Sequence, residues 1–505
     1  MNLHILKSTG ILLIIFLFNH LAYAQELKPS SLFTDHMVLQ REMPVPIWGT
    51  AKAGEKITVT FDGQSKTTIT ASNGKWKVKL NPLKASFEGQ ELKISGNTDI
   101  TFKDILVGEV WLCSGQSNMA FPRKNVNELT PLYMNAISSK IPLRTFRVIE
   151  NVAFDPIENA VGKWESVPSE SAVAFGFSYY LQKGINVPVG IIRSCWGSSS
   201  IEGWMPISLT EKLPHYKEKM KTFKQNDVKQ VTQLMESMKG KPNAAQNVKG
   251  KDNIFLRTRP NILFNAMMHP LAPFAMRGMV WYQGEANGKS YIDHINYKKS
   301  LPIWLNSLRA LWGRDFHFMA VMLPGYGKII TPTCKDYDYP NVFSWASFRE
   351  GQLAILKESK TAVANTIDLG LINNIHPADK EPIGKRLALL AQKNIYKKNI
   401  TAQGPTYKKH KIQKDKVIIT FEHAEGLKTK NAKAPQSFWI SGDDEKWYPA
   451  KATIEGKTVI LHAKEVQKPK ACRYAFAAKP TVNLINKHNL PAYPFRTDKR
   501  ELVKK

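Results

Sequence analysis

Cysteine is scarce in this chain, with four among 505 residues. They are widely separated, at Cys113, Cys195, Cys334 and Cys472. This number and spacing exclude a disulfide scaffold and match no zinc ligand set, so we expect no metal site. Cys113 and Cys195 each end an apolar run, which is typical of small buried residues. A single bridge stays open, because such a bond can form in an oxidising compartment.

Long apolar runs are also missing, apart from one near the N-terminus. Residues 11–18 are all apolar, Lys7 precedes them, and Ala22-Tyr23-Ala24 fits a small-x-small cleavage site. A bilayer requires ~20 apolar residues, so this run is too short to span one. The pattern predicts a signal peptide over residues 1–24, cleaved after Ala24, and a secreted or periplasmic protein without stable membrane insertion. An anchoring N-terminal helix is the alternative.

Acidic residues are few relative to basic ones: 42 Asp and Glu face 71 Lys and Arg, which gives a formal net charge of +29. Such a surplus could serve nucleic acid, an anionic surface or an acidic glycan. We find no RNA- or DNA-binding motif, and the lysines are dispersed through loops and polar helix faces. Solvated lysine is the favoured interpretation, and we expect no nucleic-acid partner. An acidic sugar fits the surplus without being indicated by it.

The length points to about two to four domains, because one hydrophobic core seldom organises so long a chain. In residues 25–104, short runs of alternating apolar and polar residues are separated by turn signals such as Asp62-Gly63 and Asn73-Gly74. This pattern predicts an N-terminal β-sandwich. Its expected strands are residues 45–49, 56–61, 67–70, 75–80 and 91–95.

Between residues 105 and 400 the pattern changes. Nearly continuous apolar runs, typical of strands buried on both faces, alternate with helical stretches. The expected strands include 189–193, 278–282 and 318–323, and the expected helices 172–183, 297–311, 349–358 and 382–396. This alternation predicts an α/β fold with a parallel sheet covered on both sides and with chemistry at the carboxyl ends of its strands.

A lysine-rich insertion, residues 210–253, interrupts this alternation. Its apolar residues recur at helical spacing, which predicts a surface helix or helix pair; a lid or a partner-binding role is the alternative. These residues are Tyr216, Met220, Phe223, Val231, Leu234, Met235 and Met238. After residue 400 strand-like alternation returns, for example at 417–421 and 458–462, so we assign residues 401–505 to a C-terminal β region.

Ser117 is our candidate nucleophile. It follows an apolar run that begins at Ile105 and breaks at Ser114-Gly115, where a buried strand is expected to give way to a helix. A serine at such a junction is more often only a helix N-cap, and the usual G-x-S-x-G pattern is absent. Ester hydrolysis also needs a base, an orienting acid and donors to the oxyanion.

Three later segments offer these parts. His376 lies at a loop-to-helix junction late in the α/β region, where it could face Ser117 as a base. Oxyanion donors could come from the Ser117 amide, from Gly197 and from the side-chain amide of Asn287. Gly197 and Asn287 both follow buried strands, although the glycine in either loop could instead be required by the backbone conformation of a turn. Glu285 is a carboxylate that could orient the base.

Three motifs, taken in order, resemble those of the sialate O-acetylesterase family of SGNH hydrolases: GQSNM at 115–119, WYQGEAN at 281–287 and IHP at 375–377. Residues 32–49 look like the N-terminal β domain of that family. Residues 473–498 are similar to its C-terminal segment, with Phe476 where relatives often carry tryptophan. The resemblance covers nearly the whole mature chain.

The resemblance implies an SGNH-type, flavodoxin-like core of three α/β/α layers and a serine esterase that needs no cofactor. Such an enzyme removes O-acetyl groups from sialic acids through an acetyl-enzyme. By position, Ser117 looks like the nucleophile, His376 like the base, and Gly197 and Asn287 like the oxyanion residues, while Glu285 matches the family's acidic residue. The candidate supporting residues are Gln116, Gln283, Asn373, Asn374 and Asp368.

Two departures from the family pattern matter. Asn373 and Asn374 stand where relatives often have an aspartate, and an Asp-to-Asn exchange in that role costs about 10⁴ in turnover in a serine protease. Glu285, Asp368 or Asp379 could supply the missing carboxylate, and we favour Glu285. The second departure is Gly197-Ser198-Ser199, where relatives more often show Gly-Gly-Thr; one less glycine should stiffen this loop.

Three functions therefore stay open. The favoured one is a sialate O-acetylesterase. A deacetylase of a polysaccharide such as acetyl-xylan would use the same machinery with another pocket. The third is a glycan-binding protein with a decayed triad, which the asparagines before His376 motivate.

Overall fold

The computed structural model of the protein describes residues 26–238, 248–327, 339–340 and 345–502. The predicted signal peptide, residues 1–24, lies outside the described residues, as do Cys334 and residues 239–247 of the insertion. Within the described ranges, no helix combines the length and the apolar character that crossing a membrane requires. Cys113, Cys195 and Cys472 are buried and free.

The N-terminal strands belong to two sheets. β3 (Val45–Thr50) lies between β1 (Lys28–Pro29) and β6 (Lys75–Leu80), and β4 (Lys56–Phe61) lies between β5 (Gln64–Ile69) and β7 (Ser86–Ser95). Alternate side chains of β4 and β6 are buried, in line with the period of two in the sequence. The predicted turn at Asp62-Gly63 joins β4 to β5, with φ of 49° and 70°, the geometry that favours Asp-Gly in tight hairpins.

One long strand, β8 (Asp99–Gly115), connects these sheets to the rest of the protein. Its first part pairs with β7, and its second part pairs in parallel with β11 (Val189–Cys195) and β12 (Gly278–Tyr282). The predicted boundary between residues 104 and 105 falls inside this strand, beside Asp104, whose φ is 55°. The Asp104 carboxylate accepts hydrogen bonds from Arg144 and His36, both at 2.7 Å. A continuous strand, and not a linker, therefore joins the two parts.

The central sheet has the strand order β10-β9-β11-β8-β12-β13-β14. The strands not yet introduced are β9 (Leu143–Arg147), β10 (Trp164–Glu165), β13 (His317–Val321) and β14 (Thr361–Ala364). Neighbours along this path are parallel except for the pair β10 and β9. β11 and β12 are buried along their whole length, as predicted for strands covered on both faces. The predicted mixed α/β class is confirmed.

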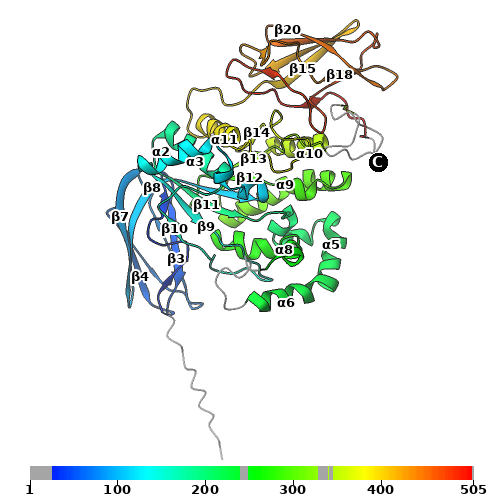
Figure 1. Ribbon diagram of the computed structural model, residues 1–505. Coiled ribbons are helices and arrows are strands. Elements are labelled where there is room, and N and C mark those ends of the chain that lie inside the picture. The colour runs from blue at the N-terminus through cyan, green and yellow to red at the C-terminus, as the bar shows by residue number, and fades with distance from the viewer. Residues whose placement is uncertain (1–25, 239–247, 328–338, 341–344, 503–505) are drawn as a thin grey trace, which may run out of the picture.

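Helices pack beside this sheet (Figure 1). α3 (Ala172–Ile185) lies against α11 (Glu381–Asn394), and α9 (Tyr291–Trp312) lies against α10 (Trp345–Leu353). All four overlap helices that the sequence predicts. They leave the loops after β8, β11, β12 and β14 at the carboxyl ends of the parallel strands, where the predicted site residues lie.

The lysine-rich insertion is helical, as predicted. Its described helices are α5 (Lys217–Thr222), the π-helical η4 (Phe223–Asp227), α6 (Val228–Met238) and α8 (Gly250–Arg257). Five of the seven apolar residues that carry the predicted stripe are buried, and Leu234 and Met235 are half-buried. Lys219 on α5 forms an ion pair with the buried carboxylate of Glu202, so the insertion is fastened to the core by a polar contact as well.

The C-terminal part holds two four-stranded sheets. One consists of β15 (Thr406–Gln413), β16 (Lys416–Glu422), β21 (Thr458–His462) and β20 (Lys451–Glu455). The other consists of β19 (Trp447–Pro449), β18 (Phe438–Ser441), β22 (Ala471–Tyr474) and β24 (Phe495–Arg496). The strands predicted at 417–421 and 458–462 lie within β16 and β21.

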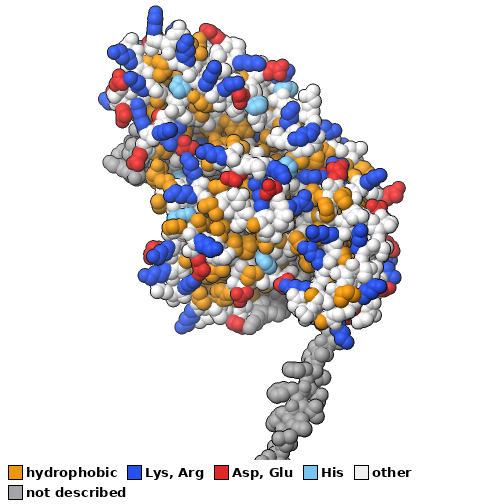
Figure 2. Space-filling view, turned by 180° about the vertical axis from the view of Figure 1, so that it is seen from behind, with side chains coloured by type: hydrophobic (Ala, Val, Ile, Leu, Met, Phe, Trp, Pro, Cys, Tyr) orange, Lys and Arg blue, Asp and Glu red, His pale blue; other side chains and the backbone are white. Residues whose placement is uncertain are grey.

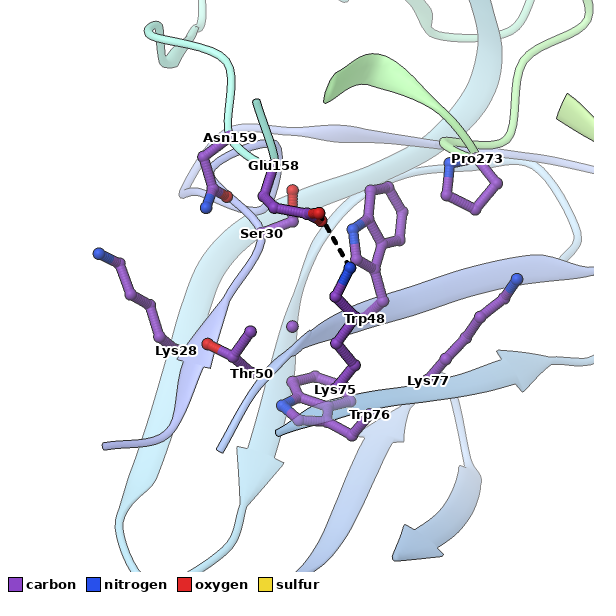
Figure 3. A pocket seen from close by; sticks show the side chains of 11 residues that line it. Lys28, Ser30, Trp48, Thr50, Lys75, Trp76, Lys77, Glu158, Asn159 and Pro273 are labelled. Atoms are coloured by element: carbon purple, nitrogen blue, oxygen red, sulfur yellow. Dashed lines mark hydrogen bonds and ion pairs between the residues drawn. The ribbon is translucent and has the colours of Figure 1, made fainter. Parts of the chain in front are cut away.

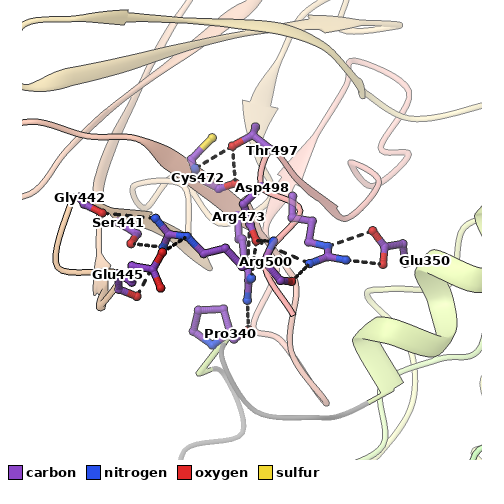
Figure 4. Close-up of polar contacts among 11 residues, drawn as sticks. Pro340, Glu350, Ser441, Gly442, Glu445, Cys472, Arg473, Thr497, Asp498 and Arg500 are labelled. Atoms are coloured by element: carbon purple, nitrogen blue, oxygen red, sulfur yellow. Dashed lines mark hydrogen bonds and ion pairs between the residues drawn. The ribbon is translucent and has the colours of Figure 1, made fainter. Parts of the chain in front are cut away.

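Arginines fasten this β region to the α/β part. Arg349 of α10 is fully buried and donates hydrogen bonds to the carbonyl oxygens of Ala477 (2.7 Å) and Ala478 (2.8 Å). The neighbouring Glu350 accepts two hydrogen bonds of 3.0 Å from Arg496 of β24 (Figure 4). The same short helix thus carries one buried and one partly exposed link to the C-terminal sheets.

The surface has two features that bear on function. Lys and Arg side chains are scattered over the face in Figure 2 without a continuous basic patch, in line with the dispersed lysines of the sequence. A cavity of about 220 Å³ lies beside β3 and β6, with Trp48, Trp76, Glu158 and Pro273 among its lining residues (Figure 3). None of the predicted site residues lines this cavity.

Replacing Arg349 with leucine should strongly destabilise the protein, because buried carbonyl oxygens of Leu323, Pro324, Ala477 and Ala478 would lose their donor. We expect a loss of ~3 kcal/mol or more in the free energy of unfolding. Arg496→Gln, which breaks a partly exposed pair, should cost less than ~1 kcal/mol. Calorimetric unfolding of both variants measures the difference, and equal shifts would contradict the role of Arg349.

Candidate active site

Ser117 lies where β8 ends and the short helix α1 (Ser117–Ala120) begins. The turn depends on Gly115, which has a φ of 140° and lies so close to β12 that a Cβ there would be 2.1 Å from the Tyr282 carbonyl oxygen. Only glycine fits this position. The turn leaves Ser117 half-buried while Asn118 and Met119 point into the protein.

His376 lies against this serine. Its Nε2 atom is 2.7 Å from the Ser117 Oγ, although the two residues are 259 positions apart. His376 comes from the loop between β14 and α11. Its backbone N–H donates a hydrogen bond of 2.8 Å to the Oδ1 of Asn374, so Asn374 contacts the backbone of residue 376 and not its ring. Asn373 is exposed.

Gly197, in the loop after β11, lies directly beside Ser117. A Cβ on Gly197 would be 3.4 Å from the Ser117 Cβ, which is ordinary van der Waals contact. The next residue, Ser198, has a φ of 58°, in the left-handed region that costs a non-glycine residue ~1 kcal/mol. Ser198 is the position at which the family pattern favours glycine, so the departure seen in the sequence coincides with local strain.

Asn287 ends the turn η7 (Glu285–Asn287) after β12. Its Oδ1 accepts hydrogen bonds from Gln283 (2.8 Å) and from the Ile201 N–H (3.0 Å), and its Nδ2 donates one to Glu202 (3.0 Å). The oxygen of this amide is therefore engaged, and one of its two N–H groups is left for a ligand.

Gln116 and Gln283 join the three loops. The Gln116 Oε1 accepts hydrogen bonds from the backbone N–H groups of Gly284 (3.3 Å) and Ala286 (3.2 Å). The Gln283 Nε2 donates one to the Ser199 carbonyl oxygen (3.0 Å). The loops after β8, β11 and β12 are thus cross-linked by side-chain amides, which supports the positioning role expected of both glutamines. No group of three or more His, Cys, Asp or Glu in the described ranges could hold a metal ion.

Comparison with known proteins finds relatives in both sequence and fold. No protein-family model matches the chain. It is 28% identical to the sialate O-acetylesterase of Rattus norvegicus over 498 residues, covering 89% of this chain and 90% of that protein, and 27% identical to that of Homo sapiens, covering 89% and 88%. A carbohydrate acetylesterase of Xanthomonas citri, known from a crystal structure, is 30% identical, with a TM-score of 0.78 over 94% of this chain and 100% of that chain.

This chain belongs to the sialate O-acetylesterase family of carbohydrate esterases. The resemblance seen in the sequence is thereby confirmed, and the protein is a carboxylic ester hydrolase.

Glu285 does not hold the imidazole of this esterase, contrary to the assignment favoured from sequence. One of its carboxylate oxygens accepts a hydrogen bond from Asn118, and the other is buried without a partner. Asp368 pairs with Arg386 through two bonds of 2.7 Å, and Asp379 accepts a bond of 3.1 Å from the Gly370 N–H. In the part of the chain that the structure describes, Ser117 and His376 therefore form a dyad with no carboxylate on the ring.

Asn118 is the residue that sequence reasoning missed. Its Nδ2 donates hydrogen bonds to Glu285 and to the Ile375 carbonyl oxygen (3.0 Å), and its Oδ1 accepts one from the Lys380 Nζ (2.8 Å). Asn118 thus has three partners, and its own side chain and those of Glu285 and Lys380 are buried. The available signal was a polar residue directly after the nucleophile, at a position where the helix had to face the core.

Charges in this cluster act on His376. Burial raises the pKa of Glu285, although the hydrogen bond from Asn118 and the charge of Lys380 oppose the shift. Burial lowers the pKa of Lys380 to about 8, with Glu285 acting in the opposite direction. Partial burial, and then the charge of Lys380, lower the pKa of His376 below its usual value of 6.5. The imidazole is therefore neutral at pH 7, the form that accepts a proton.

Glu285→Gln should leave turnover within about tenfold of wild type, because the glutamine oxygen still accepts from Asn118 and the imidazole loses no partner. An orienting triad carboxylate would instead cost about 10⁴. Steady-state hydrolysis of an aryl acetate distinguishes the two results. A loss of several orders of magnitude with an unchanged melting temperature would restore Glu285 to the triad.

The acid limb of the pH profile should have its midpoint below pH 6.5. A base with a lowered pKa stays unprotonated to lower pH, so kcat/KM holds its plateau further into the acid range. Lys380→Gln removes a positive charge near the ring and should move the midpoint upward. Rates measured from pH 4.5 to 8 check both statements; a midpoint above 6.5 in the wild type would contradict the environment described for His376.

Proposed function

We propose that this protein is a serine O-acetylesterase that removes O-acetyl groups from sialic acids, with Ser117 as nucleophile and His376 as general base. The observation that carries the proposal is the distance of 2.7 Å between the Ser117 Oγ and the His376 Nε2. Family membership adds the ester chemistry, and the substrate named for the rat and human relatives is sialate.

The reaction follows from this geometry in two halves. His376 Nε2 takes the proton of Ser117 as its Oγ attacks the acetyl carbonyl carbon, and the imidazolium then protonates the departing sugar oxygen. A water molecule attacks the acetyl-enzyme after giving a proton to His376, and acetate leaves as the proton returns to the Ser117 Oγ. The backbone at Ser117 and Gly197 and the remaining N–H of Asn287 are the proposed donors to the oxyanion.

Two hydrogen bonds take over the orienting task of a triad acid. Asn118 holds the carbonyl of Ile375, and Asn374 holds the N–H of His376, so the backbone is fixed on both sides of the base. Because both contacts are to backbone, the ring position depends on the loop. We propose that Asn374 keeps this positioning role in place of the aspartate of relatives.

The finer architecture is part of the same proposal. The two N-terminal sheets support a β-sandwich over residues 25–104, and the parallel central sheet supports an SGNH-type three-layer catalytic domain over 105–400. Residues 401–505 form the C-terminal β region. The composition of residues 1–24 supports export to the periplasm or beyond.

Acetate release from O-acetylated sialic acid and from acetyl-xylan, compared on the same enzyme, tests the substrate. We expect a preference for the sialic acid, and loss of ~10³-fold or more of the rate in Ser117→Ala and in His376→Ala. Ser114→Ala is the matched control, since this buried serine, directly before the GQSNM motif, has an unpartnered hydroxyl. Full activity of Ser117→Ala would rule out the nucleophile, and faster release from xylan would favour the polysaccharide esterase.

A further inference from the structure

Arg257 brings a positive charge to the nucleophile. It is the last residue of α8, which begins within the lysine-rich insertion and ends just beyond it. Its Nη1 lies 3.2 Å from the position that a Cβ on Gly197 would occupy, and the Ser117 Cβ lies 3.4 Å from the same position. The guanidinium and the reactive serine therefore border one small space beside Gly197.

This guanidinium has no protein partner among the described residues. Its Nε is buried without a hydrogen bond, and desolvation is the cause that lowers the pKa of Arg257. Other partly buried arginines have acceptors: Arg386 binds Asp368, and Arg259, two residues after Arg257, binds Asp227 at 2.5 Å. A half-buried cation left unpaired is costly unless a ligand supplies the anion.

Other cations near the site are already engaged. The Lys380 Nζ donates to Asn118, and Lys219 pairs with Glu202. The pair of Lys219 and Glu202 also links the insertion to Asn287, since Glu202 accepts a hydrogen bond from that amide. Arg259, two residues beyond the end of α8, binds Asp227 at the end of η4, which continues directly from α5. The segment that carries Arg257 is therefore linked to the one that Lys219 ties to the oxyanion loop.

We propose that Arg257 is the carboxylate-recognition residue of this site, binding the C1 carboxylate of the sugar whose acetyl group Ser117 attacks. The inference rests on the proposed function, because a sialic acid is an acetylated sugar that also carries a carboxylate. A guanidinium binds a carboxylate through two parallel N–H donors, which fixes orientation as well as charge. Acetyl-xylan has no such group, so the residue would select acidic sugars.

The test compares three acetyl esters on wild type and Arg257→Gln: O-acetylated N-acetylneuraminic acid, the same sugar as its C1 carboxamide, and 4-nitrophenyl acetate. We expect Arg257→Gln to lower kcat/KM for the acid ~10- to 100-fold and to leave the two neutral esters unchanged. Wild type should prefer the acid to the carboxamide by a similar factor. Lys251→Gln, which removes an exposed charge from the same helix, should change none of these ratios.

Equal losses on all three esters would overturn the proposal and make Arg257 an oxyanion donor or a structural residue. An unchanged rate on the acid would overturn it too. A second measurement separates this inference from the proposed function: unacetylated N-acetylneuraminic acid should inhibit aryl acetate hydrolysis by wild type and not by Arg257→Gln. If this inhibition occurs without acetate release from the O-acetylated acid, only the substrate assignment is wrong. If the inhibition does not depend on Arg257, the inference is wrong.

Discussion

The position of His376, the proposed base, depends on a single buried amide. Asn118 follows the nucleophile in the chain and holds the carbonyl of Ile375, which precedes His376. Because this hydrogen bond joins the loop after β8 to the loop after β14, a shift of either loop would move both Ser117 and His376. The short distance between these two side chains is maintained by hydrogen bonds to the backbone of the His376 loop. No carboxylate of the described residues binds the ring.

Buried charges flank that amide and explain residues that take no direct part in proton transfer. Glu285 and Lys380 contact opposite ends of the Asn118 side chain, so each lowers the cost of burying the other. Without Glu285, Lys380 would lose a charge that keeps it protonated. Partial burial, and then the charge of Lys380, in turn lower the pKa of His376. Glu285 thus acts on His376 only indirectly, through the charge of Lys380.

Periodicity in the sequence located the strands and helices because burial on one or two faces is a local property of the chain. The boundary predicted at residue 104 falls inside β8, which changes its surroundings at that point without ending. The closeness of Ser117 and His376 was predicted from their motifs and their places at strand ends. The partners of Glu285 and the roles of Asn118 and Arg257 were not, since the pattern of residues does not say which distant polar group a side chain will meet.

Two different cations serve substrate binding and the tuning of the base in this site. Arg257 is the proposed binding residue, and Lys380 affects the pKa of His376. Lys380 lies directly before α11, where its Nζ donates to the Asn118 Oδ1. Together with partial burial, its charge lowers the pKa of His376. Arg257 instead comes from the end of α8, and Arg259, two residues later, pairs with Asp227 of η4. Because this guanidinium lies on a helix and not in the strand-end loops, it can bind the substrate before any bond is formed or broken. The insertion therefore adds selectivity to a core whose own loops have little freedom left to provide it.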